Sequence, residues 1–246
     1  MDKTTHFGYK KVDSNKKQKL VDDVFDSVAN NYDLMNDLMS FGMHRFWKKY
    51  TTEISGINKN DVVLDLAGGT GDMAYRFSKI IGPKGRLILC DINNSMLTEG
   101  RKKLIDKGVI NIDFIQANAE KLPFKENHFD CVNIAFGLRN VTDKELALKQ
   151  IYKILKKGGR LLILEFSKIN NKALSKLYDF YSFSIIPKIG HLITKDKDSY
   201  QYLSESICQH PSQKLLKEMV HKAGFKFCEY HNLSQGIVAV HKAIKI

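Results

Sequence analysis

Short apolar runs alternate with helical segments along the middle of this chain, and this alternation restricts the fold more than any other feature. The runs have the length and composition of buried strands and lie at 61–66, 86–91, 111–116, 129–136 and 160–166. Segments with apolar residues at helical spacing separate them. Strands that alternate with helices predict right-handed crossovers and a mostly parallel sheet covered on both faces. The middle of the chain is therefore expected to form a doubly wound α/β sheet.

The flanking segments have a different rhythm. Before and after the sheet, the apolar spacing predicts helices at 17–30, 172–186, 198–208 and 212–223. Two further apolar runs, 225–230 and 236–242, predict an antiparallel hairpin that closes the sheet. Within the middle of the chain, Thr142 and Glu145 predict a capping box at the start of a helix that ends before Gly158.

The size of the chain indicates one core. A chain of 246 residues with 43% hydrophobic residues can bury a sizeable core, so a single domain at 1–246 is expected. We divide it into an N-terminal helical cap at 1–58, a core at 59–168, and C-terminal helices with the closing hairpin at 169–246.

The charge and the cysteines indicate a cytoplasmic protein without a nucleic-acid partner. Lys and Arg exceed Asp and Glu by 39 − 27 = 12, but the lysines are spread along the chain and form no concentrated basic patch. The four cysteines form no C-x-x-C pair, which is typical of reduced thiols. No signal-peptide pattern and no apolar stretch of about 18 residues is visible. Any membrane contact is therefore expected to be peripheral, at the inner face of the membrane.

A glycine-rich turn follows the first strand of the predicted sheet. Residues Asp65 to Gly71 read D-L-A-G-G-T-G, and Gly69 and Gly71 would let the backbone approach a ligand closely. In an open α/β sheet such a turn lies at the carboxyl ends of the strands, where ligands bind. Asp91 ends the second strand, where a carboxylate accepts hydrogen bonds from both hydroxyls of a ribose. Together the turn and the carboxylate indicate a cofactor that contains adenosine.

The charge near the turn separates two classes of cofactor. A nicotinamide dinucleotide brings a pyrophosphate, whereas S-adenosylmethionine brings a sulfonium and an amino-acid end. Asp65 at the mouth of the turn, and a D-x-A-x-G-x-G pattern in place of G-x-G-x-x-G, favour the sulfonium compound. Asn118 and Ala119 follow the third strand, which is the usual site of adenine recognition in such enzymes. The expected cofactor is S-adenosyl-L-methionine.

Four further segments make the chain similar to a known family. The segments 32–44, 136–142, 165–167 and 178–187 begin Y-D-L-M-N-D, F-G-L-R-N-V, E-F-S and Y-D-F-Y. With the glycine turn they resemble the ubiquinone/menaquinone biosynthesis C-methyltransferases over nearly the whole chain. The resemblance implies a Rossmann-like class I S-adenosylmethionine-dependent methyltransferase fold, with a mostly parallel seven-stranded sheet, an antiparallel C-terminal hairpin and N-terminal helices. It also implies C-methylation of a polyprenylated quinol ring in ubiquinone biosynthesis, menaquinone biosynthesis or both.

The same resemblance assigns residues to the cofactor. It implies that the cofactor is contacted by Thr70, Asp91, Asn118, Ala119 and Ala135. Many relatives have serine where this chain has Ala135. A contact at that position would therefore use the backbone and not a hydroxyl.

Three residues are candidates on the side of the methyl acceptor. Arg139 follows the fourth strand and could stabilise the phenolate that makes a quinol ring carbon nucleophilic; an arginine that only braces its loop is the alternative. His44 and Tyr178 are further candidates, with packing as their alternative. The run 180–187 would line a groove for a prenyl tail or cover the sheet. No spacing typical of a metal site appears, so no metal is expected.

Two other functions stay open. One is a methyltransferase that acts on RNA or another small metabolite, which the positive charge permits. Residues 135–140 disfavour it, because they lack the N/D-P-P-Y/F motif of many nucleic-acid N-methyltransferases. The other is a non-catalytic RNA-binding protein on the same fold, which the intact glycine turn and Asp91 disfavour. A homo-oligomer and a complex of quinone-biosynthesis proteins are also left open.

Overall fold

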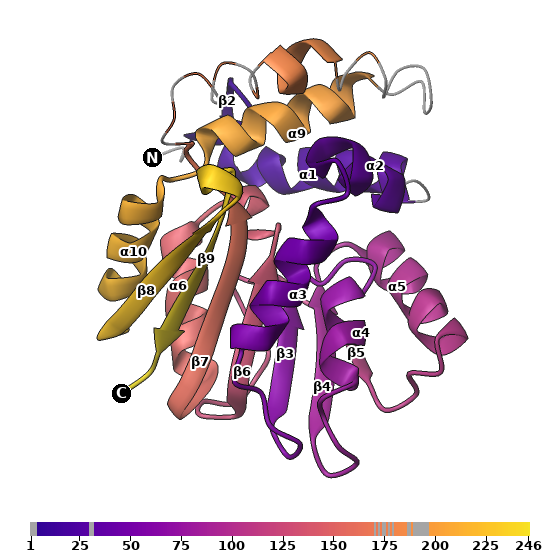
Figure 1. Cartoon of the computed structure of the whole chain (residues 1–246), viewed down its shortest axis with the longest axis vertical. Coiled ribbons are helices and arrows are strands. Elements are labelled where there is room, and N and C mark those ends of the chain that lie inside the picture. Colours follow the sequence, from indigo (N-terminus) through magenta and orange to yellow (C-terminus); the bar gives the residue numbers. More distant parts are fainter. Residues whose placement is uncertain are drawn as a thin grey trace.

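A seven-stranded sheet forms the centre of the computed structural model, which describes residues 4–29, 32–169, 171, 173, 176, 178, 180–185, 188 and 197–246 (Figure 1). The strands follow the order β5-β4-β3-β6-β7-β9-β8. Their bounds are β3 (Val62–Leu66), β4 (Arg86–Asp91), β5 (Asp113–Gln116), β6 (Phe129–Ala135), β7 (Leu155–Phe166), β8 (Phe227–Leu233) and β9 (Val238–Ile244). Neighbouring strands from β5 to β7 are parallel, whereas β9 runs antiparallel to β7 and β8. The predicted fold class is thereby confirmed.

Apolar side chains cover both faces of the sheet because successive residues of a strand point to opposite sides. On one face Val63 and Leu89 pack with α4 (Asp72–Ser78) and α5 (Asn94–Asp106). On the other face Leu64 and its neighbours pack with α6 (Lys144–Ile154) and α10 (Gln213–Lys222). The continuous apolar runs of the sequence are thus explained by burial on both sides.

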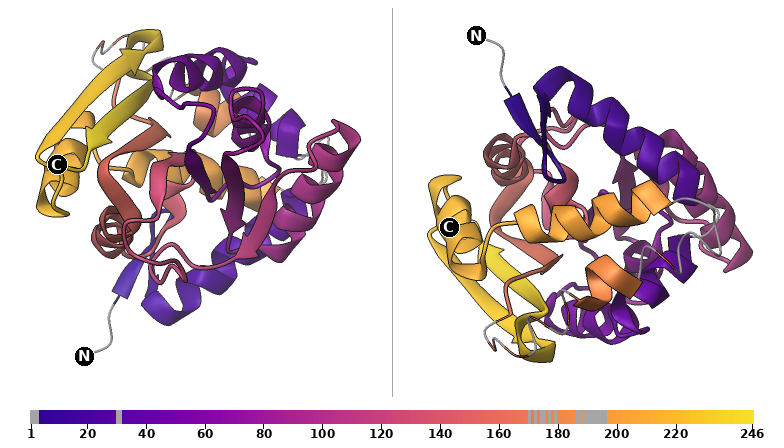
Figure 2. Two further views of the ribbon diagram at one scale, coloured as in Figure 1. Left: turned by 90° about the horizontal axis from the view of Figure 1, so that it is seen from below. Right: turned by 90° about the horizontal axis from the view of Figure 1, so that it is seen from above.

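A third group of helices lies across the carboxyl ends of the strands. It consists of α1 (Ser14–Val28), α2 (Tyr32–Ser40) and α9 (Lys197–Gln209), whereas α3 (His44–Ile54) runs along one face of the sheet beside α4. Figure 1 shows α1, α2 and α9 above the sheet, and the right view of Figure 2 shows α1 beside α9. The apolar stripe of α1, which includes Val21 and Val24, is buried in one cluster with Tyr200 and Leu203 of α9. Within the described residues, no helix is both long and apolar enough to cross a membrane.

The first ten described residues differ from the expected helical cap. They form a hairpin of β1 (Thr4–Phe7) and β2 (Lys10–Asp13), with Gly8 at φ 55° in its turn. Phe7 stacks on Tyr202 of α9, with 4.1 Å between the ring centroids. The strands are short and mostly polar, so their sequence carries no alternation that would predict them. The division into three parts stays a prediction.

The predicted capping box before α6 is wrong. The side chain of Asp143, not that of Thr142, caps the helix by accepting from Leu146 N, and Thr142 N donates to Glu120. The helix also ends earlier than expected, at Ile154, because Leu155 already pairs with Phe129 as the first residue of β7.

The C-terminal hairpin is confirmed, but its turn lies later than predicted. The turn occupies Ser234–Gly236, where Ser234, Gln235 and Gly236 all have positive φ angles. Trp47 Nε1 donates to Ser234 Oγ over 2.9 Å, which ties the turn to α3. Of the predicted helix at 172–186, the described residues are 173, 176, 178 and 180–185; the first four of these are helical, and Tyr181–Ile185 form a π-helical turn.

Candidate functional site

The strand order reverses between β3 and β6. From β3 the chain adds β4 and β5 on one side, and it then returns to add β6 and β7 on the other. Such a switch point leaves a crevice at the carboxyl ends of the two strands. The loops that leave them touch here, since a Cβ on Gly137 would lie 2.6 Å from Ala67 Cβ.

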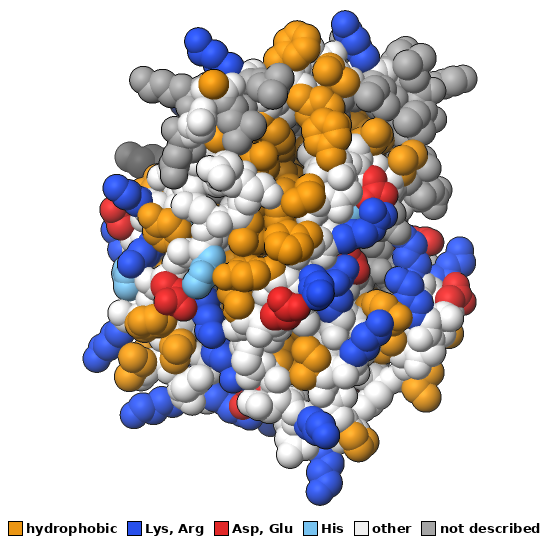
Figure 3. Space-filling view, viewed as in Figure 1, with side chains coloured by type: hydrophobic (Ala, Val, Ile, Leu, Met, Phe, Trp, Pro, Cys, Tyr) orange, Lys and Arg blue, Asp and Glu red, His pale blue; other side chains and the backbone are white. Residues whose placement is uncertain are grey.

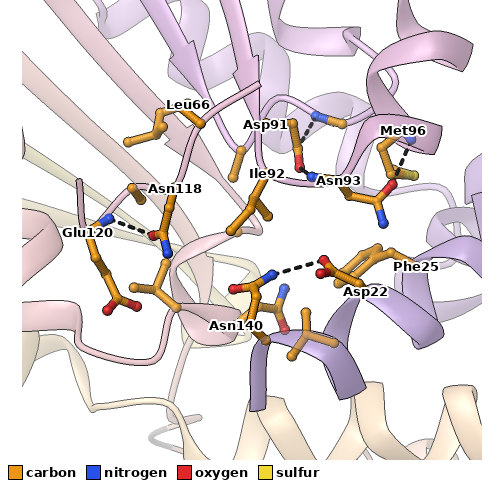
Figure 4. Close-up of a pocket in the computed structure, with 18 of the residues that line it drawn as sticks. Asp22, Phe25, Leu66, Asp91, Ile92, Asn93, Met96, Asn118, Glu120 and Asn140 are labelled. Carbon is orange, nitrogen blue, oxygen red and sulfur yellow. Dashed lines mark hydrogen bonds between the residues drawn. The ribbon is translucent and has the colours of Figure 1, made fainter. Parts of the chain in front are cut away.

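A cleft of about 680 Å³ opens at this point (Figure 4). Its walls come from five parts of the chain that are far apart in sequence, and include Leu66, Gly69, Asp91, Asn118 and Phe136. The lining is mostly apolar with a few polar groups, which is typical of cofactor sites. Of the eight residues predicted for the cofactor, four line this cleft: Gly69, Asp91, Asn118 and Ala119.

The glycine turn forms one wall and is strained into shape. Ala67, Gly69 and Gly71 have φ angles of 51°, 54° and 81°. Residues other than glycine rarely adopt this left-handed region. Helix α5 packs tightly against it, because a Cβ on Gly100 would lie 2.7 Å from the carbonyl oxygen of Gly69. The turn is therefore held open by its own conformation and by its neighbour.

Asp65 lies beneath this turn and does not line the cleft. Its carboxylate accepts from Ala74 N at 2.9 Å and from Asn133 Nδ2 at 2.8 Å, across the register pair of β3 and β6. Burial raises the pKa of Asp65 to about 7, although the hydrogen bonds from Asn133 and Ala74 oppose the rise. The structure thus places Asp65 as a support of the turn, and its predicted contact with the cofactor stays a prediction.

Asp91 joins the turn to the second strand. Its Oδ2 accepts from Gly69 N at 2.8 Å and its Oδ1 accepts from Asn93 N at 3.0 Å, so both oxygens are held in fixed positions. Burial raises the pKa of Asp91, and these backbone hydrogen bonds oppose the rise. Each carboxylate oxygen can accept a second hydrogen bond, so Asp91 can serve a diol that enters the cleft.

Asn118 and Glu120 close the cleft on the side of β5. Asn118 Oδ1 accepts from Glu120 N at 2.8 Å, and Asn118 lines the cleft. Glu120 Oε1 accepts from the backbone N–H groups of Thr142 and Asp143, each at 3.1 Å. The loop after β5 is thereby fastened to the loop after β6.

Helix α1 supplies a wall that the sequence did not predict. The cleft is lined by Gln18, Val21, Asp22 and Phe25 from this helix. Gln18 Nε2 donates to Asp22 Oδ1 at 2.9 Å, and burial raises the pKa of Asp22. The apolar spacing predicted a helix at 17–30, but no sequence signal says that its buried face covers a ligand site.

Three other residues that were predicted to contact the cofactor do not line the cleft. Thr70 is buried, Gly71 is the residue before α4, and Ala135 packs among the apolar side chains at the end of β6. Their contacts with a cofactor stay predictions.

A second cavity, of about 840 Å³, is almost wholly apolar. Its lining comes from α2, α3, the C-terminal hairpin turn and the segment near 180, and includes Phe41, Trp47, Tyr181 and Ile237. Figure 3 shows hydrophobic side chains gathered on the face that α2 and α3 occupy in Figure 1. Phe41 stacks on Tyr181 with 4.2 Å between centroids, and Tyr181 Oη donates to Leu38 O.

A pair of aromatic rings connects the two cavities. Phe136 lines the cleft and Trp47 lines the apolar cavity, and their ring centroids are 6.2 Å apart. Both rings also lie against Phe166 of β7. A ligand bound in the cleft and a ligand bound in the apolar cavity would therefore lie on the two sides of this aromatic pair.

Arg139 is buried and engaged with its own fold. Its Nη1 donates to Glu165 Oε1 at 3.0 Å and to Phe136 O, and both ionic side chains are only 2% exposed. Glu165 also accepts from the backbone N–H groups of Arg139 and Phe166. These contacts match the loop-bracing alternative, and the catalytic role of Arg139 stays a prediction.

His44 and Tyr178 lie on the side of the apolar cavity. His44 is buried, its Nε2 is 2.8 Å from Asp37 Oδ1, and burial lowers its pKa. Tyr178 lines the cavity, and its hydroxyl finds no hydrogen-bond partner within the described part of the chain. Burial raises the pKa of Tyr178, so its hydroxyl stays protonated at neutral pH. Neither candidate is shown to act on a ligand.

Comparison with known proteins identifies close relatives. A family model described as the ubiE/COQ5 methyltransferase family matches residues 11–245. A Shewanella baltica protein named Ubiquinone/menaquinone biosynthesis C-methyltransferase UbiE is 58% identical over 244 residues, which cover 99% of this chain and 97% of that protein. A Pseudomonas putida protein of the same name is 59% identical over 243 residues, which cover 98% and 95%.

Solved structures agree on the fold. A SAM dependent methyltransferase from Aquifex aeolicus has a TM-score of 0.60 at 17% identity and covers 96% of this chain and 100% of its own. A Thermotoga maritima structure described as a SAM-dependent methyltransferase has a TM-score of 0.62 at 22% identity and covers 91% and 98%. Likeness at this identity bears on the fold alone.

The ion pair of Arg139 and Glu165 yields a stability prediction. Arg139→Met should lower the free energy of unfolding by about 3 to 5 kcal/mol, because Glu165 would remain buried without its cation. Adding Glu165→Gln should restore part of the loss. Urea unfolding measures both. The matched control is Arg86→Met, whose exposed pair with Asp113 should contribute less than about 1 kcal/mol. A cost for Arg139→Met no larger than that of the control would contradict the prediction.

Proposed function

This chain belongs to the ubiE/COQ5 methyltransferase family, as its resemblance indicated, and we propose that it transfers the methyl group of S-adenosylmethionine to a ring carbon of a polyprenylated quinol in ubiquinone biosynthesis, menaquinone biosynthesis or both. The observation that carries this proposal is the pairing of the two cavities. A cleft with a fixed carboxylate and an almost wholly apolar cavity are joined by an aromatic contact, because Phe136 lines the first and Trp47 lines the second. Such an arrangement suits a polar cofactor beside a lipid-like acceptor.

The residues of the cleft fit the cofactor. Asp91 would accept from the ribose hydroxyls, Asn118 Nδ2 would donate to adenine, and Leu66 and Ala119 would flank the ring. A cation bound near Asp22 and Asp65 would favour their ionised forms, although burial raises the pKa of both. When bound, S-adenosylmethionine supplies a methyl group already activated by its sulfonium. The part of the protein is then to bind and align the two reactants and to keep water out.

The apolar cavity fits the acceptor. A prenyl chain is a hydrocarbon, and its transfer from water to apolar surroundings is favourable by roughly 25 cal/mol for each Å² that is buried. An RNA acceptor would bring phosphates, which such a lining cannot solvate. The cavity therefore supports a quinol over RNA, and it gives an RNA-binding scaffold no evident use.

The acceptor must lose a phenol proton, which would pass to a water molecule, before its ring carbon becomes nucleophilic, and the methylated carbon would then lose its own proton to water. Tyr178, which stays protonated, would donate a hydrogen bond to the developing phenolate. Arg139 lies near enough to Tyr178 to oppose the rise in its pKa, so its charge would favour the same anion from a distance. Arg139 would then act as a positioning and electrostatic residue. His44 would orient α2 through Asp37.

The electrostatic role of Arg139 predicts a loss of rate. In the folded Arg139→Met/Glu165→Gln protein, kcat should fall about tenfold to a thousandfold while cofactor affinity is kept.

The rim of the apolar cavity supports peripheral contact with a membrane. Phe41, Met43 and Phe180 are 71%, 41% and 60% exposed, which is unusual for large apolar side chains in one place. A membrane surface there would deliver a prenylated acceptor directly to the cavity. A homo-oligomer and a complex of quinone-biosynthesis proteins remain further proposals without a structural argument.

The assignment of Asp91 predicts a loss of cofactor affinity. Asp91→Ala should weaken S-adenosylmethionine binding at least about a hundredfold, because two charge-assisted hydrogen bonds to ribose are lost at roughly 1.5 kcal/mol or more each. Asp91→Asn should lose less, since it keeps one oxygen acceptor. Isothermal titration measures the affinities, and Asp106→Ala, at the exposed end of α5, is the control. Unchanged affinity in a folded Asp91→Ala protein would refute the assignment.

The function itself predicts a dependence on the redox state of the acceptor. Only the reduced quinol should be methylated, because the oxidised ring is electron-poor and has no phenol to ionise. The assay follows a labelled methyl group from S-adenosylmethionine into demethylated benzoquinol and naphthoquinol acceptors under anaerobic conditions. Equal labelling of quinone and quinol, or no labelling of either reduced acceptor, would contradict the proposal.

The apolar cavity predicts a selective effect on the tail. Phe41→Ser should raise KM for a prenylated quinol about tenfold or more, because burial of a phenylalanine side chain is worth roughly 1.5 to 3 kcal/mol. It should leave KM unchanged for the same ring without a tail. Phe46→Ser is the matched control, because Phe46 is also exposed, at 55%, but does not line the cavity. Equal effects of the two substitutions would show that Phe41 contributes only general surface hydrophobicity.

A further inference from the structure

A third cavity lies under the N-terminal hairpin, between α1, α6 and α9. It encloses about 470 Å³, and its lining differs from both cavities above because it gathers positive charge. Lys17 comes from α1, Arg139 from the loop after β6, and Lys144 from the first turn of α6. His6 of β1 and Tyr202 of α9 complete the part of the lining that bears on its chemistry.

Two ammonium groups converge in this cavity. Lys17 Nζ donates to Val141 O at 3.3 Å, and Lys144 Nζ donates to the same oxygen at 3.1 Å. Lys17 is only 4% exposed. Within the described chain, neither lysine forms an ion pair with a carboxylate. An ammonium group that is buried without a carboxylate in direct contact is rare in proteins, because its desolvation is only partly compensated.

The carboxylates of the neighbourhood have other partners. Glu165 is paired with Arg139, Glu120 accepts from the backbone after β6, and Asp143 caps α6. Glu205, beside the hairpin, accepts from Tyr9 N. None of them forms a direct ion pair with either lysine, although Glu165, Glu120 and Asp143 lie near enough to oppose the fall in the pKa of Lys144.

The buried groups nearby respond to this positive charge. Burial and the neighbouring Lys144 lower the pKa of Lys17 to about 8, while Glu120 opposes the decrease. Burial lowers the pKa of His210 well below its usual value, and Lys144 and Arg139 add to the decrease. Arg139 Nε has no hydrogen-bond partner among the described residues. The cavity thus has one unused donor, Arg139 Nε, and two ammonium groups without a carboxylate in direct contact.

We propose that this cavity binds a small phosphate-class dianion, held by the ammonium groups of Lys17 and Lys144 with Arg139 Nε as a further donor. Each ammonium group has three N–H donors and uses one on Val141, so four remain for the anion. The opening beneath the hairpin admits an inorganic oxyanion or the phosphomonoester headgroup of a lipid, and the experiment below separates these two sources.

The anion would also act on the cofactor cleft. Val141 lines that cleft, and so does Gln18, the residue after Lys17. An anion that joins Lys17 to Lys144 would fasten α1 to the loop after β6, and these two segments are the walls that must come together around a ligand. We therefore expect the anion to raise the affinity for S-adenosylmethionine. This second effect rests on the proposed function, whereas anion binding itself does not.

The first test is titration of the full chain with sulfate, without added cofactor, at constant ionic strength set by sodium chloride. Sulfate should raise the melting temperature of the wild type, and its apparent affinity should fall at least about tenfold in Lys17→Met and Lys144→Met. The matched controls are Lys19→Met and Lys149→Met, exposed lysines of the same two helices, which should behave as the wild type. Equal stabilisation in all five proteins, or by chloride as much as by sulfate, would overturn the site.

A pH series tests the role of Lys17. The charge of sulfate is constant between about pH 7 and about pH 9, so a change in affinity reports on the protein. Sulfate favours protonated Lys17, and its affinity should therefore fall as the pH rises through about 8. The other titratable groups around Lys17 are His6, Glu120, Arg139, Lys144, Glu165 and Tyr202. The decrease should vanish in Lys17→Met; if it persists there, Lys17 is not the group that holds the anion.

Two further arms identify the source and the coupling. Vesicles of phosphatidylcholine with and without phosphatidic acid test a lipid headgroup: binding that needs both phosphatidic acid and Lys17 assigns the site to the lipid, and sulfate binding alone assigns it to a free oxyanion. S-adenosylmethionine is then titrated with and without sulfate. Sulfate binding that leaves cofactor affinity unchanged would refute the coupling and keep the site. A protein that binds sulfate but no S-adenosylmethionine would instead refute the proposed function.

Discussion

The candidate cofactor site depends on two buried carboxylates that hold one turn of backbone in a strained conformation. Asp65 fixes the start of α4 through Ala74 N, and Asp91 fixes the crest of the turn through Gly69 N. Both carboxylates sit at the ends of parallel strands, so the sheet itself sets their positions. Because each carboxylate is desolvated, it is stable only while those N–H groups point at it. The hydrogen bonds thus hold the turn in its strained conformation and also compensate the burial of the two carboxylates. The shape of the cleft depends on them.

The sequence predicted what is encoded locally or repeated along the sheet. The seven strands were predicted from short apolar runs that end near glycines. Because the carboxyl ends of parallel strands lie at one edge of the sheet, Gly69, Asp91, Asn118 and Ala119 could be expected in one cleft, and they line it. The sequence could not predict Gln18 or Asp22 there, because which surface an amphipathic helix covers is decided by tertiary packing. The capping box failed for a related reason: Glu120, a residue outside the helix, binds the N–H of Thr142, and Asp143 caps in its place.

The N-terminal part of the chain does more than cover the sheet. Helix α1 lines the cofactor cleft, α2 and α3 line the apolar cavity, and Trp47 both bounds that cavity and holds the C-terminal hairpin turn through Ser234. Lys17 reaches across to the loop after β6. All three cavities described above therefore have one wall from the first 60 residues, and a rearrangement of this part would alter all of them together.

The position of α9 and β9 also has a consequence for synthesis on the ribosome. The apolar stripe of α1 rests on α9, which is complete only at Gln209, and β9 lies between β7 and β8 although it is the last strand to be made. While the chain is still growing, Val21, Val24 and Val28 have no partner from α9, and the edge of β7 exposes unpaired backbone groups. The nascent chain thus carries an open strand edge and an apolar helix face until its last quarter emerges. Chaperone binding should therefore concentrate on these two surfaces during translation.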